Sequence, residues 1–342
     1  MIIIVLFIHM MPPGRVDVRL SLDAQSIYNF ITELISHNLG AIAVPTFFVL
    51  SGYYFFYSIK EDAGYDIKWF AGKYKKRIRT LLIPYLFWNL ALIVAILLRN
   101  GLALVIGGDL DIEALRDVDL LKWFWTDPIN FPLWYLRDLI CMVLLAPLFY
   151  LGTRYLKLGV LALLAVSYFF EWSVPVAGFS SSSMFFFGLG AYLGINRQNL
   201  LTLCRKVKAP SIILVAVLLL LLTLKNTAPF HSWVLKIYIP IGIVAAVNIV
   251  DAMKSVTVTG LASLSGMVFF IYAVHEIFIV GWFNGIYRSI WGTSLFSYSI
   301  RYVTEPFLVL LTCMTIYWVL YKIVPGFLAF ACGGRKYELR KA

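Results

Sequence analysis

The chain has 342 residues, of which 61% are hydrophobic and only 14% are charged, and its mean hydropathy is +0.85. Soluble domains carry about 25% charged residues, so this composition excludes an ordinary soluble protein and favours an integral membrane protein. The net charge of +11 does not indicate a nucleic-acid partner, because the basic residues lie in short loops between apolar runs. The four cysteines show neither CxxC nor zinc-ligand spacing, so they indicate no disulfide framework and no metal site.

Long apolar runs, rather than the short alternating segments of a barrel, dominate the sequence and indicate transmembrane helices. A helical crossing needs about 20 mostly apolar residues. We predict ten spans, near residues 1–11, 39–57, 81–98, 133–150, 157–170, 183–195, 211–224, 233–250, 264–283 and 304–323. The predicted fold class is therefore all-α, a polytopic bundle in which residues 1–342 form one domain surrounded by membrane lipids.

The first apolar run, residues 1–11, is unusually short and is followed by Pro12 and Pro13. Eleven residues cannot cross a bilayer at 1.5 Å per residue. The run also lacks the basic region and the small-residue cleavage site of a secretory signal. We therefore expect the first helix to be shortened at its amino end, with further residues encoded in frame before Met1.

The loops differ in charge, and the difference predicts an orientation. The loops at 58–80 and 196–209 and the C-terminal tail are rich in Lys and Arg, whereas the longest loop of the other side, 99–132, is mainly acidic. The positive-inside rule then favours ten spans with both termini in the cytoplasm. Within the acidic loop an amphipathic helix on the outer surface is predicted from the apolar residues Ile112, Leu115, Val118, Leu121 and Trp125.

Titratable groups inside predicted spans are costly and therefore need an explanation. His9 lies in the first span, and an imidazole can take a proton from a hydroxyl and return it. His275 and Glu276 lie in the ninth span; Tyr272 shares a helix face with His275, whereas Glu276 points about 100° away. The alternative for all of these residues is a neutral hydrogen-bonded network that fixes helix packing.

Two further groups of polar residues are candidates for binding. Arg137 and Asp138 lie one turn inside the predicted outer end of the fourth span, where Arg137 either pairs locally or binds an anionic or sugar substrate. Lys76, Arg77 and Arg79 belong to a dense basic stretch before the third span. That stretch is either a topology signal that contacts anionic lipids or a site for a phosphorylated cofactor, which arginine binds bidentately.

Several segments, taken together and in order, resemble the acyltransferase family 3 of membrane proteins, whose members acylate bacterial surface polysaccharides and related glycans. The matching segments are 4–9 (IVLFIH), 44–53 (VPTFFVLSGY), 76–88 (KRIRTLLIPYLFW), 133–136 (LWYL), 186–194 (FFGLGAYLG) and 270–275 (FIYAVH). The resemblance spans almost the whole chain and agrees with the ten predicted spans.

The resemblance implies transfer of an acyl group, usually acetyl from acetyl-CoA, to a hydroxyl of a sugar, a glycan or a lipid-linked sugar. It implies that His9 is the catalytic residue and that Lys76, Arg77 and Arg79 lie on the acyl-CoA side. No cofactor is implied beyond acyl-CoA as a co-substrate. The family also has an arginine about ten residues before this histidine, at a position that would precede Met1, which agrees with a shortened first helix.

Within this interpretation, Tyr272, His275 and Glu276 are expected to support the reaction, and Arg137 with Asp138 to contact the glycan. Two other classes remain open: a proton-coupled transporter or exporter of an envelope component, and a non-catalytic relative of the fold. A transporter also needs titratable groups inside the membrane, but it usually shows internal repeats, which this sequence lacks.

Overall fold

The structure of the chain, a computed structural model, describes residues 1–11, 18–59, 66–106, 119–253 and 264–335. Within these ranges the chain forms helices and no strand. The helices of the first half are α1 (Ile2–His9), α2 (Ala24–Thr32), η1 (Glu33–Leu39), η2 (Gly40–Ile42), α3 (Ala43–Phe56), α4 (Ile67–Arg77), η3 (Ile78–Leu82), α5 (Ile83–Ile106), η5 (Lys122–Thr126), η6 (Phe131–Leu133), α6 (Trp134–Leu144) and α7 (Ala146–Leu156). The second half contains α8 (Leu158–Phe169), α9 (Ser181–Ile195), α10 (Leu200–Arg205), α11 (Lys208–Leu224), α12 (His231–Ala252), α14 (Ser265–Val274), η7 (His275–Ile279), α15 (Val280–Trp291), α16 (Leu295–Ile323) and α17 (Pro325–Ala331).

All ten predicted segments are helical, but they differ in length. Five described stretches are long and apolar enough to cross a membrane: Ala24–Phe56, Ile67–Val105, His231–Ala252, Ser265–Trp291 and Leu295–Ile323. A sixth is present if Phe131–Leu144 and Ala146–Leu156, which bend by 54° at their junction, count as one span. The remaining four segments fall on the shorter helices α1, α8, α9 and α11. The structure thus supports a multi-pass helical membrane protein, and the number ten stays a prediction.

The second predicted span begins too late. The helical stretch runs from Ala24 rather than from residue 39, because Asp23 caps α2 and the π-helical η1 and the 3₁₀ turn η2 continue it into α3. The Asp23 carboxylate accepts the backbone N–H of Ser26 at 2.9 Å, which satisfies one free donor of the first turn. Hydrogen bonds from Ser21 and Ser26 lower the pKa of Asp23 to about 2.

The predicted surface helix lies mostly outside the described residues, since 107–118 are not among them. Of its apolar positions the structure describes Leu121, which is exposed, and Trp125, which is half-buried in η5.

The closest helix packing joins α3 and α9, and each helix places a glycine against the backbone of the other. A Cβ built on Gly52 would lie 2.2 Å from the carbonyl oxygen of Phe187, and one on Gly190 would lie 2.0 Å from that of Val49. Only glycine allows this approach, the arrangement by which small residues let membrane helices meet through their backbones. One large hydrophobic cluster extends from this contact through α6, α14 and α16.

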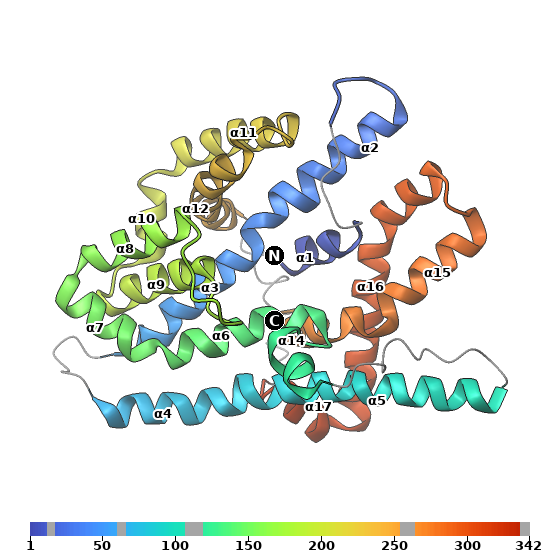
Figure 1. Cartoon of the computed structure of the whole chain (residues 1–342), viewed down its shortest axis with the longest axis horizontal. Helices are drawn as coiled ribbons and strands as arrows, with labels where there is room; N and C mark the ends of the chain where they lie inside the picture. Colours follow the sequence, from blue (N-terminus) through green and yellow to red (C-terminus); the bar gives the residue numbers. More distant parts are fainter. Residues whose placement is uncertain (12–17, 60–65, 107–118, 254–263, 336–342) are drawn as a thin grey trace.

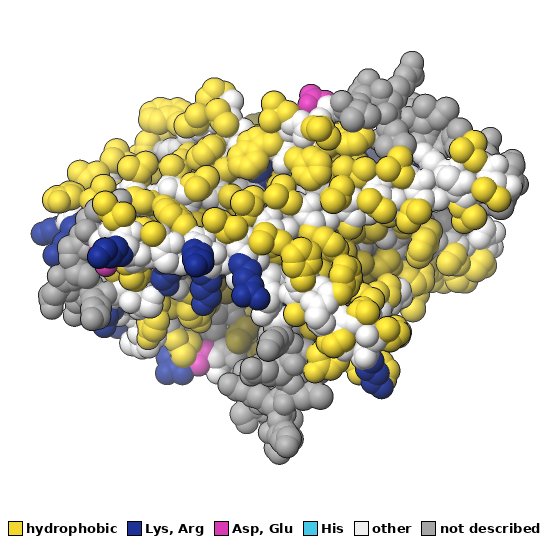
Figure 2. Space-filling view, turned by 90° about the horizontal axis from the view of Figure 1, so that it is seen from below, with side chains coloured by type: hydrophobic (Ala, Val, Ile, Leu, Met, Phe, Trp, Pro, Cys, Tyr) yellow, Lys and Arg dark blue, Asp and Glu magenta, His cyan; other side chains and the backbone are white. Residues whose placement is uncertain are grey.

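Figure 1 shows α4 and α5 as one long rod along the lower edge of the molecule, with α17 against its middle. The short helix α1 lies near the centre of the picture and contacts η1, α16 and α14. Seen from below, the half formed by α4 carries a row of Lys and Arg side chains, and hydrophobic side chains cover most of the rest (Figure 2). The fold therefore holds α1, which ends at His9, among longer helices.

Candidate active site

The ninth predicted span does not continue as a regular helix through His275 and Glu276. α14 ends at Val274, the π-helical segment η7 follows, and the backbone leaves helical geometry at Ile277 (φ −73°, ψ 83°) and Phe278 (φ 63°, ψ −20°). A positive φ is strained for a residue with a side chain, and such strain is concentrated at functional sites. π-Helical turns are also frequent at functional sites. Glu276 directly precedes this break.

His9 and Glu276 meet at this break. Nδ1 of His9 lies 2.8 Å from Oε1 of Glu276, and the two side chains expose 16% and 29% of their surface. The pair is therefore partly buried but still accessible to a substrate. With Nδ1–H held by the carboxylate, Nε2 of His9 keeps its lone pair and can act as a base.

His275 completes the cluster. Its ring centroid lies 4.8 Å from that of His9, in an edge-to-face arrangement, and its side chain is fully buried. Nδ1 of His275 lies 3.1 Å from the carbonyl oxygen of Ile271 and 2.9 Å from that of Tyr272. Because both partners are acceptors, Nδ1 must carry the proton, which leaves Nε2 as an acceptor. That atom has no hydrogen-bond partner among the described residues.

The three side chains also have a spacing that could suit a metal ion, since one ligand atom from each of His9, His275 and Glu276 lies within 4.8 Å of the others. The chemistry of the donors favours proton transfer instead. Nδ1 of His9 is engaged by the carboxylate and Nδ1 of His275 by carbonyls, and an imidazole fixed in this way presents one defined atom to a substrate hydroxyl.

Residues of the segment before α6 support the cluster from one side. The Tyr272 hydroxyl donates to the carbonyl of Pro132, and the amide of Asn130 donates to the carbonyl of Ala273 at 3.0 Å. The ring of Phe131 lies 6.2 Å from that of His9. The Tyr272 hydroxyl therefore faces Pro132 rather than the imidazole of His9.

Arg301, which was not predicted from the sequence, holds the C-terminal end of α1. Arg301 in α16 donates from Nη2 to the carbonyl of Met10 at 2.8 Å, directly after His9, and its Nε lies 3.4 Å from Oε2 of the buried Glu305. The sequence signal for this pair was an Arg and a Glu four residues apart at the start of an apolar run, a spacing that allows an ion pair on one helix face.

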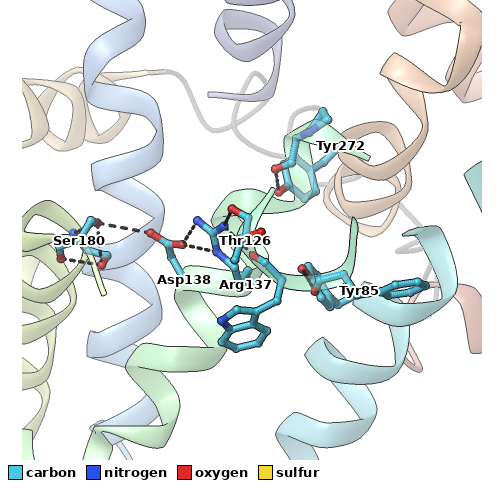
Figure 3. Close-up of polar contacts among 10 residues, drawn as sticks. Tyr85, Thr126, Arg137, Asp138, Ser180 and Tyr272 are labelled. Carbon is cyan, nitrogen blue, oxygen red and sulfur yellow. Dashed lines mark hydrogen bonds and ion pairs between the residues drawn. The ribbon is translucent and has the colours of Figure 1, made fainter. Parts of the chain in front are cut away.

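Arg137 and Asp138 form a separate network (Figure 3). Nε and Nη2 of Arg137 donate to Oδ1 of Asp138 at 3.0 and 2.8 Å, and Nη1 donates to the carbonyls of Trp125 and Thr126 at 2.9 Å each. Ser180 lies 3.4 Å from the other carboxylate oxygen of Asp138. All three guanidinium nitrogens of Arg137 are thus engaged within the protein, which disfavours the predicted contact with a glycan.

The three residues predicted to bind the acyl-CoA donor differ in how far they are exposed. Lys76 and Arg79 are exposed. Arg77 is half-buried and lies over the ring of Phe55, 5.6 Å from its centroid. Of the three, only Arg77 is half-buried. A residue that served only as a topology signal would not need to be buried.

Comparison with known proteins identifies the family of the chain. A family profile described as an acyltransferase domain matches residues 1–322. The chain is 27% identical over 327 residues to the succinoglycan biosynthesis protein ExoH of Rhizobium meliloti (strain 1021), an alignment that covers 92% of this chain and 85% of that protein. No solved structure matches the chain significantly. The chain therefore belongs to the acyltransferase family 3 of membrane proteins, whose profile it matches over residues 1–322.

Proposed function

We propose that this chain is a membrane O-acyltransferase that moves an acyl group, acetyl in the simplest case, from acyl-CoA to a hydroxyl of a sugar or glycan acceptor. The observation that carries the proposal is the His9–Glu276 pair, 2.8 Å apart, with Nε2 of His9 left to accept a proton. Membership of an acyltransferase family supports it independently.

In the proposed reaction His9 is the general base. Nε2 takes the proton of the acceptor hydroxyl while the hydroxyl oxygen attacks the thioester carbonyl. A C–O bond forms, the C–S bond breaks, and the proton passes from the imidazolium to the departing thiolate of coenzyme A. The carboxylate of Glu276 stabilises the imidazolium and fixes its ring, the role that an acid plays beside a catalytic histidine.

His275 is proposed to orient the acceptor. Its Nε2 has no partner among the described residues and carries a lone pair, so it can accept a hydrogen bond from a substrate hydroxyl next to the one that reacts. The same tautomer cannot donate to the oxyanion of the transition state. This reasoning favours orientation of the acceptor by His275 over stabilisation of the thioester oxyanion.

The donor is proposed to arrive from the cytoplasm. Acyl-CoA is made there, and the charge of the loops favours ten spans with both termini and the stretch of Lys76, Arg77 and Arg79 on that side of a bacterial inner membrane. The similarity to a succinoglycan biosynthesis protein supports a polysaccharide, or a lipid-linked sugar that becomes one, as the acceptor.

Transfer of labelled acetyl from acetyl-CoA to glycan in membranes tests the proposal. We expect His9→Ala and His9→Gln to lower the rate about 10²–10⁴-fold, the usual contribution of a general base. His37→Gln is the matched control, because His37 pairs with Glu33 at 2.9 Å and lies outside the cluster. Unchanged transfer by His9→Ala would remove the catalytic assignment.

The same assay separates the other classes. A transporter would move acceptor across the membrane without moving label, and a non-catalytic relative would do neither. Label in the acceptor made by the unaltered protein, and its loss in the His9 variants but not in His37→Gln, is the outcome that only the enzyme gives.

A further inference from the structure

The C-terminal segment folds back onto the start of α5. Leu328, Ala331 and Cys332 are buried, and the indole N–H of Trp88 donates to the carbonyl of Ala331 at 2.9 Å. Figure 1 shows α17 against the middle of the long rod, where η3 joins α4 to α5. The end of α17 is therefore fixed beside the basic stretch rather than extended away from it.

A glycine pair then turns the chain toward that stretch. Gly333 and Gly334 have φ values of +68° and +79°, a region that residues with side chains rarely adopt. A Cβ on Gly333 would lie 2.9 Å from Cα of Thr80 and 3.0 Å from the carbonyl oxygen of Arg79. The turn thus needs glycine twice over, for its conformation and for its close approach to η3.

The turn delivers Arg335 to a defined position. Nη1 of Arg335 donates to the carbonyls of Thr80 at 3.1 Å and Cys332 at 2.9 Å, and the guanidinium lies 4.2 Å from the ring centroid of Phe269. A guanidinium has five N–H donors, and those on Nε and Nη2 make no hydrogen bond to the described residues. Burial lowers the pKa of Arg335, and the nearby charge of Arg77 lowers it further.

Arg77 and Arg335 are thus two half-buried cations at the same segment, since Arg77 directly precedes η3 and Arg335 donates to Thr80 within it. No carboxylate among the described residues pairs with either of them. The buried hydroxyl of Thr80 also lacks a hydrogen-bond partner within the described part of the chain. Like charges and an unpaired hydroxyl in a sheltered place are costly, and an oxyanion bound between them would relieve that cost.

We propose that Arg335 and Arg77 form one oxyanion site that binds a phosphate group of the coenzyme A part of the donor. The proposal rests on the function proposed above and adds a residue outside the sequence that the family profile matches, which ends at residue 322. Paired guanidinium groups suit phosphate because each offers a planar fork of donors. On this basis Arg335 binds the acyl-CoA donor and is distinct from the other basic residues of the C-terminal tail.

A line of aromatic and hydroxyl groups leads from this site to His9. The charges of Arg77 and Arg335 both act on Tyr135, whose hydroxyl lies 3.3 Å from that of Ser51. The Tyr135 ring lies 6.1 Å from that of Tyr272, which is one helical turn from His275. A phosphate at the arginine pair would direct the pantetheine arm along this line toward the imidazole cluster.

Binding of coenzyme A to the purified full chain tests the site without any acceptor. We expect Arg335→Ala to weaken binding about tenfold to hundredfold, the loss typical of a charge-assisted hydrogen bond, and Arg335→Lys to weaken it less. Lys322→Ala is the matched control, because it removes the same charge from the end of α16, where the ammonium lies over the Trp318 ring. Equal binding by Arg335→Ala and Lys322→Ala would overturn the proposal.

Transfer kinetics identify the source of the oxyanion. With acetyl-CoA, Arg335→Ala should raise KM with little change in kcat, whereas S-acetyl-pantetheine, which lacks the phosphates, should be used equally by both proteins. A loss confined to succinyl-CoA would assign the site to an acyl carboxylate, and an equal loss with every donor would make Arg335 structural; either result rejects the phosphate assignment. If the unaltered protein binds coenzyme A but transfers nothing, the proposed function fails while the binding comparison still decides the site.

Discussion

Two of the polar clusters in the described part of this apolar bundle differ in how well their atoms are paired. In the Arg137–Asp138 network every guanidinium nitrogen donates to a carboxylate or a carbonyl (Figure 3). In the cluster of His9, His275 and Glu276, Nε2 of His275 is buried without a partner among the described residues. Both clusters combine charged or titratable side chains, and both stood out in the sequence.

The difference indicates which cluster reacts. A buried network whose members are all paired rigidifies the protein and has no donor or acceptor left for a substrate. A cluster that leaves directed lone pairs open costs stability until something binds there, and such violations are expected at functional sites. The two clusters therefore predict opposite results for the same kind of substitution.

The largest expected effect is on folding, from Arg137→Ala. Removing one member of a buried ion pair leaves the other charge uncompensated, which typically costs about 3–5 kcal/mol. We expect a corresponding drop in the unfolding temperature of the detergent-solubilised protein and low yield from membranes. The rate per folded molecule and the KM for the acceptor should stay unchanged, as measured by acetyl transfer normalised to folded protein.

The matched control removes both charges. Arg137→Met with Asp138→Leu replaces the pair by apolar groups of similar size, and this exchange is often neutral or stabilising. The double variant should therefore be more stable than Arg137→Ala alone. A double variant that folds well but has a raised KM for the acceptor would return Arg137 to its predicted role in glycan binding.

The second prediction concerns activity, from Glu276→Gln. The amide keeps a hydrogen bond to Nδ1 of His9 but loses the charge that stabilises the imidazolium, so we expect kcat to fall, by up to about 10⁴-fold, with KM unchanged. Glu276→Asp should retain part of the rate. Thermal unfolding should be close to that of the unaltered protein, since the pair is partly exposed. If Glu276→Gln loses stability but keeps its rate, Glu276 is structural, like the Arg137–Asp138 network.

The sequence predicted the helices well because their signal is local. An apolar run that must satisfy its backbone in lipid can only be helical, and all ten predicted segments are. The amino-terminal extension to Ala24 was missed because α2 is polar on one side and hydropathy alone does not detect it. The short helices α8, α9 and α11 explain why length could not decide the number of spans.

The site was predicted in its residue types but not in its geometry. His9, His275 and Glu276 stood out because titratable groups are rare within spans. Adjacent residues of a helix point about 100° apart, and only the folded chain places His9 of α1 against both His275 and Glu276. The break that follows at Ile277 and Phe278 also had no signal in the sequence. Arg335 was counted as one of several basic residues of the tail, since only the folded chain brings Gly333 against Thr80.

The smallest expected effect comes from Ser180, at the edge of the first cluster. Its Oγ accepts the backbone N–H of Ser183 at 3.1 Å and so caps α9, while its 3.4 Å distance to Asp138 makes that contact a weak one. Ser180→Ala should therefore cost about 1 kcal/mol of stability, the usual value of an N-cap, and leave transfer unchanged. Ser180→Asn is the matched control, because asparagine can also cap a helix.

Ser180→Asn separates the cap from the contact with Asp138. If it restores the stability lost in Ser180→Ala, capping accounts for the effect, and Asp138 depends on Arg137 alone. If both variants instead alter acetyl transfer, the network around Asp138 is coupled to the reaction. A network that only supports the fold should not change the rate when Ser180 is replaced. Such a result would therefore show that complete hydrogen bonding does not separate the Arg137–Asp138 network from the imidazole cluster.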